Sequence, residues 1–533
     1  MTSECVTRDP GLGIDLNRIP ALDELQLGHL RHIENLVNQL PGDWSKMGGV
    51  DPGQELFDAY RYQLAYMAYT LGLAHYHWLP AAPSATKPTF EKTVEKMLRR
   101  DVWGYWKETS RGARVLDPDI KELREPWTDP VVKENIMYSG HLYMMTGMHA
   151  ALFDDDRYDA PGALTFNWDP IFQGLAPESH VYQRSSLGEA IYWQMVENGW
   201  LGVACEPNCI FIVCNQFPMI GFRFEDLRNG TARADEATSA YAAAWERRGM
   251  YAGNGSFHPF LMVKQNQLVP PVGIANDAWV ASVMNTWNRD VVREVFPQQL
   301  RGTLKTGPDG TLSHYAPSVV PKARAALAAG EPADLPQDTT DPATDPTFGL
   351  VAAALSEIGD ERVQGMLAHA DRFMNPTWEK GGLYYPRNDR AWDAEGNRTG
   401  VDTMTGNIML GYSRLNVPDG LWSLYNRPWT AEHFAEPRVA SQDGAFDLRR
   451  AYYHRDSQTL LLTARPREGK SSDVSLTVAN ASAQPWTLSA DGVAVAGSDG
   501  PEHTSAVHVV ADGDTLHIST TLHSETTLGL RWS

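Results

Sequence analysis

Helical periodicity recurs from residue 51 to residue 434, and it constrains the fold more than any other feature of this sequence. Apolar residues return at helical spacing in QELFDAYRYQLAYMAYTLGLAHYHWL (54–79), where Ala and Gly favour close helix packing. Short loops rich in Pro, Gly and Asp separate the segments that follow. Helices are expected at 88–109, 131–153, 184–199, 235–248, 276–297, 318–330, 345–357 and 360–374. This pattern predicts paired helices around a ring, a helical toroid, rather than a four-helix bundle.

The composition changes near residue 435. From there, short runs alternate polar and apolar residues, as in TLLLTARP and DTLHISTTL, with Asp-Gly turn signals between or beside them. Strands are sparse before this point, and the clearest is CIFIVCNQF at 209–217. The sequence therefore predicts a mainly α chain in three parts. These are an N-terminal arm (1–50), a helical catalytic domain (51–434) and a small antiparallel, β-sandwich-like domain (435–533).

Charge and hydropathy exclude two kinds of partner. The net charge of −20 argues against nucleic acids and anionic membrane surfaces, because both bind to a basic face. The sequence has no run of about 18 apolar residues, so we expect no membrane span. The N-terminus lacks the charged start and the apolar core of a signal peptide, which favours a cytoplasmic location.

Standard cofactor and nucleophile motifs are missing from the sequence. It contains no GxGxxG after an expected strand, no GxxxxGK[ST], no HExxH and no GxSxG. Three of the four cysteines, Cys205, Cys209 and Cys214, lie close together, but they lack CxxC spacing and have no His at zinc-finger distance. We therefore expect neither a metal nor a cofactor.

The three clustered thiols have two interpretations. Free Cys packs as a small hydrophobic residue, so all three can be buried core groups on a strand. Alternatively, the polar neighbours Glu206 and Asn208 can position or ionise the thiol of Cys205. Pro207 breaks the strand between Cys205 and Cys214, so these two thiols can converge on one pocket without sharing a strand face.

A second polar cluster lies on the expected helix NIMYSGHLYMM. Met137 and His141 are four residues apart and share one helix face. One interpretation is a core Met beside a core His that has its own hydrogen-bond partner. The other is a catalytic His, because Tyr138, Ser139 and His141 form a polar group that is costly to bury without partners.

These segments resemble the linalool dehydratase/isomerase family. The resemblance runs through DPGQELFDAYRYQLAYM and NIMYSGHLYMM, is most specific in CEPNCIFIVCNQFPMIGF, and covers roughly residues 40–430. It implies an (α/α)6 barrel. Members of the family assemble into rings, which raises a homo-oligomer as a hypothesis here. Without a cofactor, they hydrate myrcene to linalool, dehydrate linalool and isomerise linalool with geraniol.

The resemblance also implies site residues. Cys205 and Cys214 match the family's two catalytic cysteines in separation and setting, and Met137 and His141 match its Met/His pair. The family's acidic residue and tyrosine fall within the segment 51–66. The predicted catalytic residues are Cys205, Cys214, His141, Asp51, Tyr60 and Tyr62, and the predicted substrate contacts are Met137, Tyr138, Glu206 and Tyr251.

The predicted reaction is an acid–base hydration, dehydration or isomerisation of a small apolar, terpenoid alcohol or alkene. Loss of water from an allylic alcohol needs an acid near the oxygen, a base near a C–H bond and a dry cavity. Aromatic rings and Met stabilise the cationic carbon without capturing it. The environment can tune thiol, phenol and imidazole groups to donate or accept the proton.

Two other functions stay open at this point. Helical toroids also host sugar epimerases and glycoside hydrolases, and the abundant Trp residues suit sugar stacking. Carboxylates for that chemistry are available at Asp154, Asp155, Asp156, Glu379 and Asp402. The Cys/Tyr/His set fits sugar chemistry poorly. A third hypothesis is a non-catalytic protein that binds an apolar ligand.

Overall fold

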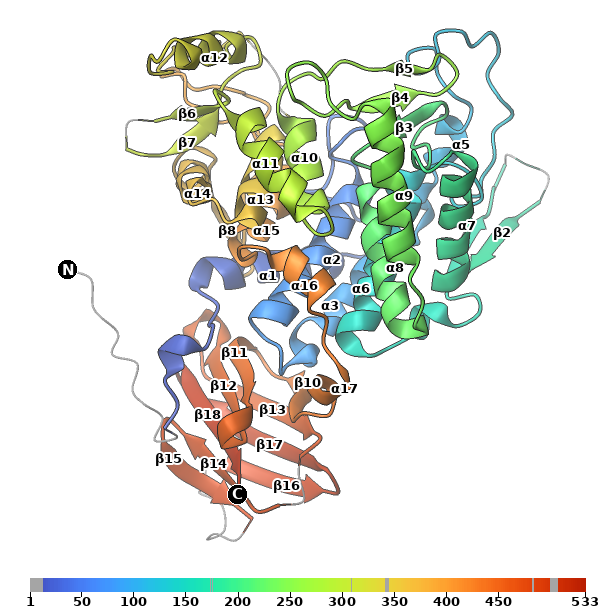
Figure 1. The fold of residues 1–533 in the computed structure, drawn as a ribbon. Helices are drawn as coiled ribbons and strands as arrows, with labels where there is room; N and C mark the ends of the chain where they lie inside the picture. Colours follow the sequence, from blue (N-terminus) through green and yellow to red (C-terminus); the bar gives the residue numbers. More distant parts are fainter. Residues whose placement is uncertain are drawn as a thin grey trace.

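The structure is a computed structural model with a helical body and, below it in Figure 1, a β domain. It describes residues 13–172, 174, 176–307, 309–340, 345–481, 484–498 and 507–533. The first twelve residues of the predicted N-terminal arm lie outside the described residues.

Among the described residues, six helices form the inner wall of the helical body. They are α2 (Tyr60–His77), α6 (Ile136–Phe153), α8 (Gln216–Asn229), α10 (Ala275–Met284), α13 (Thr347–Ile358) and α15 (Leu410–Leu415). Each contacts the next, and α15 contacts α2, so the ring closes. Every residue of α6 is buried. A helix that is apolar on every side is typical of one enclosed by its neighbours, as these are.

The six outer helices alternate with the inner ones along the chain. They are α1 (Glu24–Val37), α3 (Lys87–Met97), α7 (Arg184–Glu197), α9 (Arg233–Arg248), α11 (Arg289–Leu300) and α14 (Arg362–Phe373). The helical body is therefore an (α/α)6 barrel, as predicted. Helix α1, which lies in the predicted N-terminal arm, packs on α15 as the sixth outer helix. Shorter helices complete the body: α4 (Arg100–Trp103), α5 (Trp106–Thr109), α12 (Val320–Ala328), α16 (Gly420–Asn426) and α17 (Ala431–Phe434).

Some helices differ from their predicted boundaries. The segment 88–109 forms three helices, α3, α4 and α5, and the segment 276–297 forms two, α10 and α11. Helix α6 begins at Ile136 rather than at residue 131. The reason is local, because Glu134 and Asn135 have φ values of 61° and 59°, which a right-handed helix does not accept.

The predicted strand at 209–217 was wrong beyond its third residue. Strand β3 (Cys209–Phe211) pairs with β4 (Phe260–Met262), and α8 begins soon afterwards. The Asn215 side chain accepts a hydrogen bond from the Val203 amide and donates to the carbonyls of Val203 and Phe211. These bonds fix a turn in place of strand pairing. A short apolar run does not by itself distinguish a strand from a buried helix start.

Small antiparallel hairpins decorate the barrel. They are β1 (Leu164–Trp168) with β2 (Glu178–Tyr182), β4 with β5 (Gln267–Leu268), β6 (Leu304–Thr306) with β7 (Leu312–His314), and β8 (Thr377–Glu379) with β9 (Gly382–Tyr384). Strands β3, β4 and β5 lie at the upper end of the ring in Figure 1, next to the start of α8.

The C-terminal domain consists of two antiparallel sheets. One has the order β10 (Arg438–Asp443), β13 (Ser472–Ala479), β17 (Thr515–Leu522) and β16 (Val507–Asp512). The other has the order β11 (Phe446–His454), β12 (Thr459–Pro466), β18 (Thr526–Trp532), β14 (Trp486–Ala490) and β15 (Val493–Gly497). Buried residues of both sheets, such as Leu476 and Leu462, share one core, which makes a β-sandwich. Leu79 and Leu415 of the helical body join this core, so the domain packs directly against the ring.

Within the described ranges, no helix combines the length and the apolar character that a membrane crossing requires.

Candidate active site

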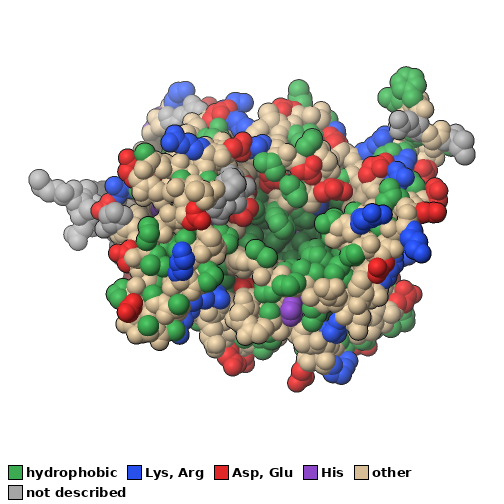
Figure 2. Space-filling model, turned by 90° about the horizontal axis from the view of Figure 1, so that it is seen from above, with side chains coloured by type: hydrophobic (Ala, Val, Ile, Leu, Met, Phe, Trp, Pro, Cys, Tyr) green, Lys and Arg blue, Asp and Glu red, His purple; other side chains and the backbone are tan. Residues whose placement is uncertain are grey.

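Aromatic side chains from four inner helices meet near the helix N-termini, at one end of the ring. Tyr62 is the third residue of α2, His141 the sixth of α6, Phe217 the second of α8 and Trp279 the fifth of α10. All four side chains are buried. Figure 2 looks onto this end of the molecule and shows a central hollow walled mainly by hydrophobic side chains. This end of the ring is therefore the candidate active site.

His141 lies at the centre of this group. The Tyr69 hydroxyl oxygen is 2.7 Å from its Nδ1, and the ring centroids of Phe217 and Tyr62 are 3.9 and 5.8 Å from its own. Its Nε2 has no hydrogen-bond partner among the described residues. Burial, and then the charge of Arg61, lower the pKa of His141 well below its usual value. The imidazole is therefore neutral at pH 7, with one ring nitrogen free to exchange a proton.

Three tyrosines of α2 face the same region. Tyr62, Tyr66 and Tyr69 follow the i, i+4, i+7 spacing of one helix face. The Trp279 Nε1–H donates to the Tyr66 hydroxyl oxygen at 2.8 Å, and the rings of Trp279 and Tyr62 meet edge to face at 5.5 Å. Burial raises the pKa of all three phenols, which keeps them protonated at neutral pH. The result is a wall of rings with hydroxyl groups that are ready to donate.

A tight turn positions the thiol pair. The Cys205 amide donates to the Cys209 carbonyl at 2.8 Å, and Asn208 within the turn has a φ of 76°. The Asn135 amide, next to the start of α6, donates to the Cys205 carbonyl at 3.0 Å and ties the turn to the helix of His141. The thiols of Cys205 and Cys214 interact with each other, and burial raises the pKa of both.

Glu206 adds a carboxyl group beside the thiols. It is half-buried, it interacts with the Cys205 thiol, and its Oε2 has no hydrogen-bond partner among the described residues. Burial raises the pKa of Glu206, and the charge of Arg61 opposes this rise. Cys209 is separate from this pair, because its thiol donates to the Leu116 carbonyl at 3.5 Å.

Two predicted catalytic residues near the start of α2 lie outside this group. The Asp51 carboxylate accepts hydrogen bonds from the Gly53 and Glu55 amides, both at 2.7 Å, and so closes its own turn. Tyr60 stacks on Trp44 with 4.3 Å between ring centroids. It lies two residues before Tyr62, so it projects from a different face of the helix.

Two predicted substrate contacts also find other partners. The Tyr138 hydroxyl donates to the Met97 carbonyl at 2.8 Å, so it points toward α3. Tyr251 lies in the segment between α9 and β4, is 39% exposed and packs beside Phe257. Met137 is buried one turn before His141 on the same helix face.

Sequence reasoning missed several residues that the fold brings to the site. They are Arg61, Tyr69, Phe217 and Trp279, together with Tyr105, whose ring centroid lies 4.1 Å from the Arg61 guanidinium carbon. Of these, only Tyr69 could have been found from local sequence spacing, because it lies seven residues after Tyr62 on the same face of one helix. Phe217 and Trp279 come from helices distant in sequence, so only ring closure places them beside His141.

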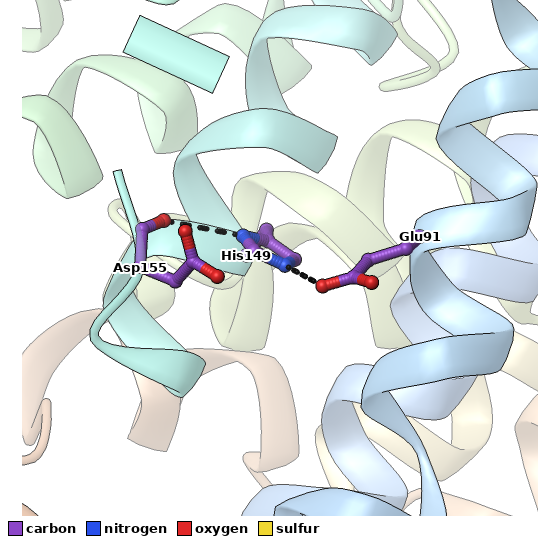
Figure 3. Close-up of side chains that lie close together, drawn as sticks. All are labelled: Glu91, His149 and Asp155. Carbon is purple, nitrogen blue, oxygen red and sulfur yellow. Dashed lines mark hydrogen bonds and ion pairs between the residues drawn. The ribbon is translucent and has the colours of Figure 1, made fainter. Parts of the chain in front are cut away.

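One group of metal-ligand side chains occurs among the described residues, near the other end of α6 (Figure 3). His149 Nε2 lies 3.1 Å from Glu91 Oε1, and its Nδ1 lies 3.3 Å from the Asp155 carbonyl oxygen. Arg157 pairs with Glu91 at 2.7 Å and with Asp155 at 2.8 Å, and Lys87 pairs with Asp155 at 2.7 Å. Two cations already neutralise both carboxylates, so ion pairing accounts for this group without a metal.

The carboxylates considered for sugar chemistry do not converge. Asp154 and Asp156 pair with Arg228 beyond the C-terminal end of α6, where Asp155 also lies. Glu379, which lies on the β8–β9 hairpin, forms an ion pair with Lys46. Asp402 is buried before the π-helical segment (Thr405–Met409) that leads into α15.

The fold and the site together define an (α/α)6 barrel with neutral imidazole, phenol and thiol groups at one end of its ring. The chain belongs to the linalool dehydratase/isomerase family, whose sequence model matches residues 61–391. This confirms the resemblance seen in the sequence. Membership implies a dehydratase/isomerase-like function.

Three solved structures of sugar-active proteins are similar to this chain at low identity. An α-amylase from Clostridium perfringens is 9% identical, with a TM-score of 0.39 over 74% of this chain and 98% of that one. An unsaturated glucuronyl hydrolase from Streptococcus agalactiae is 10% identical, with a TM-score of 0.38 over 79% of this chain and 96% of that one. A family 76 glycoside hydrolase, a mannosidase, from Bacteroides thetaiotaomicron is 9% identical, with a TM-score of 0.38 over 75% of this chain and 100% of that one. Likeness at this level says nothing about chemistry.

Proposed function

We propose that this protein is a hydro-lyase/isomerase that hydrates, dehydrates or isomerises a small apolar, terpenoid alcohol or alkene by proton transfer. One observation carries the proposal. The buried His141 imidazole packs against the rings of Tyr62 and Phe217, and its Nε2 has no hydrogen-bond partner among the described residues. An apolar enclosure with a few converging polar groups is typical of a site for a small apolar ligand.

Dehydration in this site needs one proton given and one proton taken. His141 Nε2–H and the Tyr62 hydroxyl donate hydrogen bonds that hold the substrate oxygen. A thiol of the Cys205–Cys214 pair gives that oxygen its proton, and the oxygen leaves as water when its C–O bond breaks, so a thiolate remains beside an allylic cation. This thiolate then takes a proton from the neighbouring C–H bond, whose electron pair forms the new double bond, and the thiol is regenerated. Hydration is the same sequence in reverse, and isomerisation returns water to a different carbon of the allylic cation.

The electrostatics of the site suit a cationic intermediate. His141, the tyrosines and the thiols are uncharged at neutral pH, because burial disfavours the charged form of each. The faces of the aromatic rings carry partial negative charge, which stabilises a nearby cation without forming a bond to it. Glu206 adds a carboxyl group on the thiol side.

Conversion of linalool, geraniol and myrcene by the purified protein tests the proposal, with products followed by gas chromatography and mass spectrometry. We expect interconversion by the wild type and a loss of roughly 100–1,000-fold in His141→Gln, the range typical of removing one hydrogen-bond donor from a reacting oxygen. His149→Gln is the matched control, because His149 lies on the same helix but in the ion-paired group near its other end.

Retention of these compounds without conversion would instead indicate a binding protein. Turnover of a sugar by the wild type, with none of a terpenoid, would favour the glycoside hydrolase or epimerase hypothesis.

A further inference from the structure

Arg61 is a buried cation held beside the proposed active site. It is 1% exposed, and its guanidinium carbon lies 4.3 Å from the ring centroid of Tyr62 and 4.1 Å from that of Tyr105. It donates to the Tyr62 hydroxyl oxygen at 3.0 Å and to the main-chain carbonyls of Gln54 and Glu55. The loop before α2 and two aromatic rings therefore fix the guanidinium in one place.

Among the described residues, no carboxylate pairs directly with the buried guanidinium of Arg61. Within the described ranges, no carboxylate oxygen lies within 4.0 Å of its nitrogens, whereas the equally buried Arg184 pairs with Asp156. Burying a charge without a counter-charge is unfavourable. The Glu206 carboxyl group acts on Arg61 electrostatically, and its Oε2 is buried with no hydrogen-bond partner among the described residues.

The bond to Tyr62 has a directional consequence. Arg61 only donates, so it occupies a lone pair of the Tyr62 oxygen and leaves the phenolic hydrogen free for another acceptor. The Tyr62 ring meets His141 edge to face. A phenol held in this way keeps its hydrogen available for the oxygen of the proposed substrate.

We propose that Arg61 is a positioning residue that locks the Tyr62 phenol beside His141 and serves as the fixed counter-charge of the Glu206 carboxylate. The kinetic part of this inference rests on the proposed function, and the electrostatic part does not. The titratable groups that interact with Arg61 electrostatically are Tyr62, Tyr105, His141, Cys205, Cys214 and Glu206.

The kinetic test compares Arg61→Met, Arg61→Lys, Tyr62→Phe and the double variant Arg61→Met/Tyr62→Phe. We expect Arg61→Met to lower kcat by roughly 100-fold with little change in KM, because misplacing a reacting group costs about this much. Arg61→Lys keeps the charge but not the planar stacking on the aromatic rings, so its kcat should lie between those of wild type and Arg61→Met. The double variant should be no slower than the slower single variant, because both act through one hydroxyl.

Arg100→Met is the control, because Arg100 also stacks on an aromatic ring, 3.7 Å from the centroid of Trp168, and we place it outside the site. Equal losses in the Arg61 and Arg100 variants, or multiplicative losses in the double variant, would overturn the positioning role.

A second test uses thermal unfolding and needs no substrate. At pH 8 Arg61→Met should lower Tm, and adding Glu206→Gln should restore part of it, because the variant then buries no unpaired carboxylate. Additive Tm changes would overturn the counter-charge role. Arg61→Gln with Glu206→Gln gives the same comparison if Arg61→Met does not fold, because Gln also carries no charge. Coupled Tm changes in a protein that converts no terpenoid would support the electrostatic part while the proposed function fails.

Discussion

The Tyr69 hydroxyl oxygen lies 2.7 Å from His141 Nδ1, while His141 Nε2 has no hydrogen-bond partner among the described residues. Burial keeps the Tyr69 phenol protonated, so it can donate to Nδ1. A neutral imidazole that accepts at Nδ1 carries its proton on Nε2. When the Tyr69 hydroxyl donates to Nδ1 rather than to the His141 carbonyl oxygen 3.4 Å away, His141 presents Nε2–H as a donor to the substrate oxygen.

The first prediction concerns this tautomer. Tyr69→Phe removes the hydroxyl but keeps the ring, so folding should persist while kcat falls by about 10–100-fold, less than the loss expected for His141→Gln because the imidazole itself stays in place. Steady-state kinetics together with Tm would measure both effects. Tyr76→Phe is the control, because Tyr76 lies near the other end of α2 and donates to the Arg427 carbonyl at 2.6 Å. Equal activity in Tyr69→Phe and wild type would contradict the assigned tautomer.

The second prediction separates the three thiols. Cys205→Ala and Cys214→Ala should each abolish most activity, because the pair accepts the proton in the proposed reaction. Cys209→Ala should retain activity, since the Cys209 thiol bonds to the Leu116 carbonyl away from the pair. Activity per folded molecule, with Tm for each variant, makes the comparison. If all three variants lose stability alike and keep their turnover, the thiols are core groups only.

The ring of helices could be predicted from the sequence because its cause is local. The segments of α2 and α6 carry apolar residues on every side, so each helix must be surrounded by other helices to bury them. The contents of the site were harder to predict. Cys205 and Cys214 were recognisable from one motif, but Phe217 and Trp279 reach His141 only after distant helices meet. The alternation of tyrosines on α2 gave no means of separating Tyr60 from Tyr62, whose outward and inward directions depend on how that helix is rotated in the ring.

The third prediction is that chelators leave turnover unchanged. Side chains supply every proton transfer in the proposed reaction, and the carboxylates of Glu91 and Asp155 are neutralised by Arg157 and Lys87. Activity should survive dialysis against a strong chelator, measured with the same substrate before and after treatment. A large loss that zinc restores would show that a metal takes part.

The last prediction concerns the pH dependence of stability through Asp402. Its Oδ1 accepts a hydrogen bond from the Thr405 amide at 2.8 Å, whereas its buried Oδ2 has no partner among the described residues. Burial, with the nearby charges of Asp345 and Asp58, raises the pKa of Asp402 from 3.8 to about 6. Between these two pH values the unfolded chain loses the proton while the folded chain keeps it. The free energy of unfolding therefore falls as the pH rises from about 4 to 6, and above pH 6 the loss caused by this carboxyl group stays constant.

Asp402→Asn keeps an oxygen for the Thr405 amide and removes the charge. It should therefore raise the free energy of unfolding by about 2–3 kcal/mol at pH 7.5, the equivalent of two pKa units, and leave it almost unchanged at pH 4. Urea unfolding at both pH values measures the difference. Asp360→Asn is the control with the opposite sign, because a hydrogen bond from Arg362 lowers the pKa of Asp360 and makes its charged form stabilising above pH 4. A loss of stability at pH 7.5 in Asp402→Asn would mean that the folded protein holds this carboxylate ionised with a favourable partner.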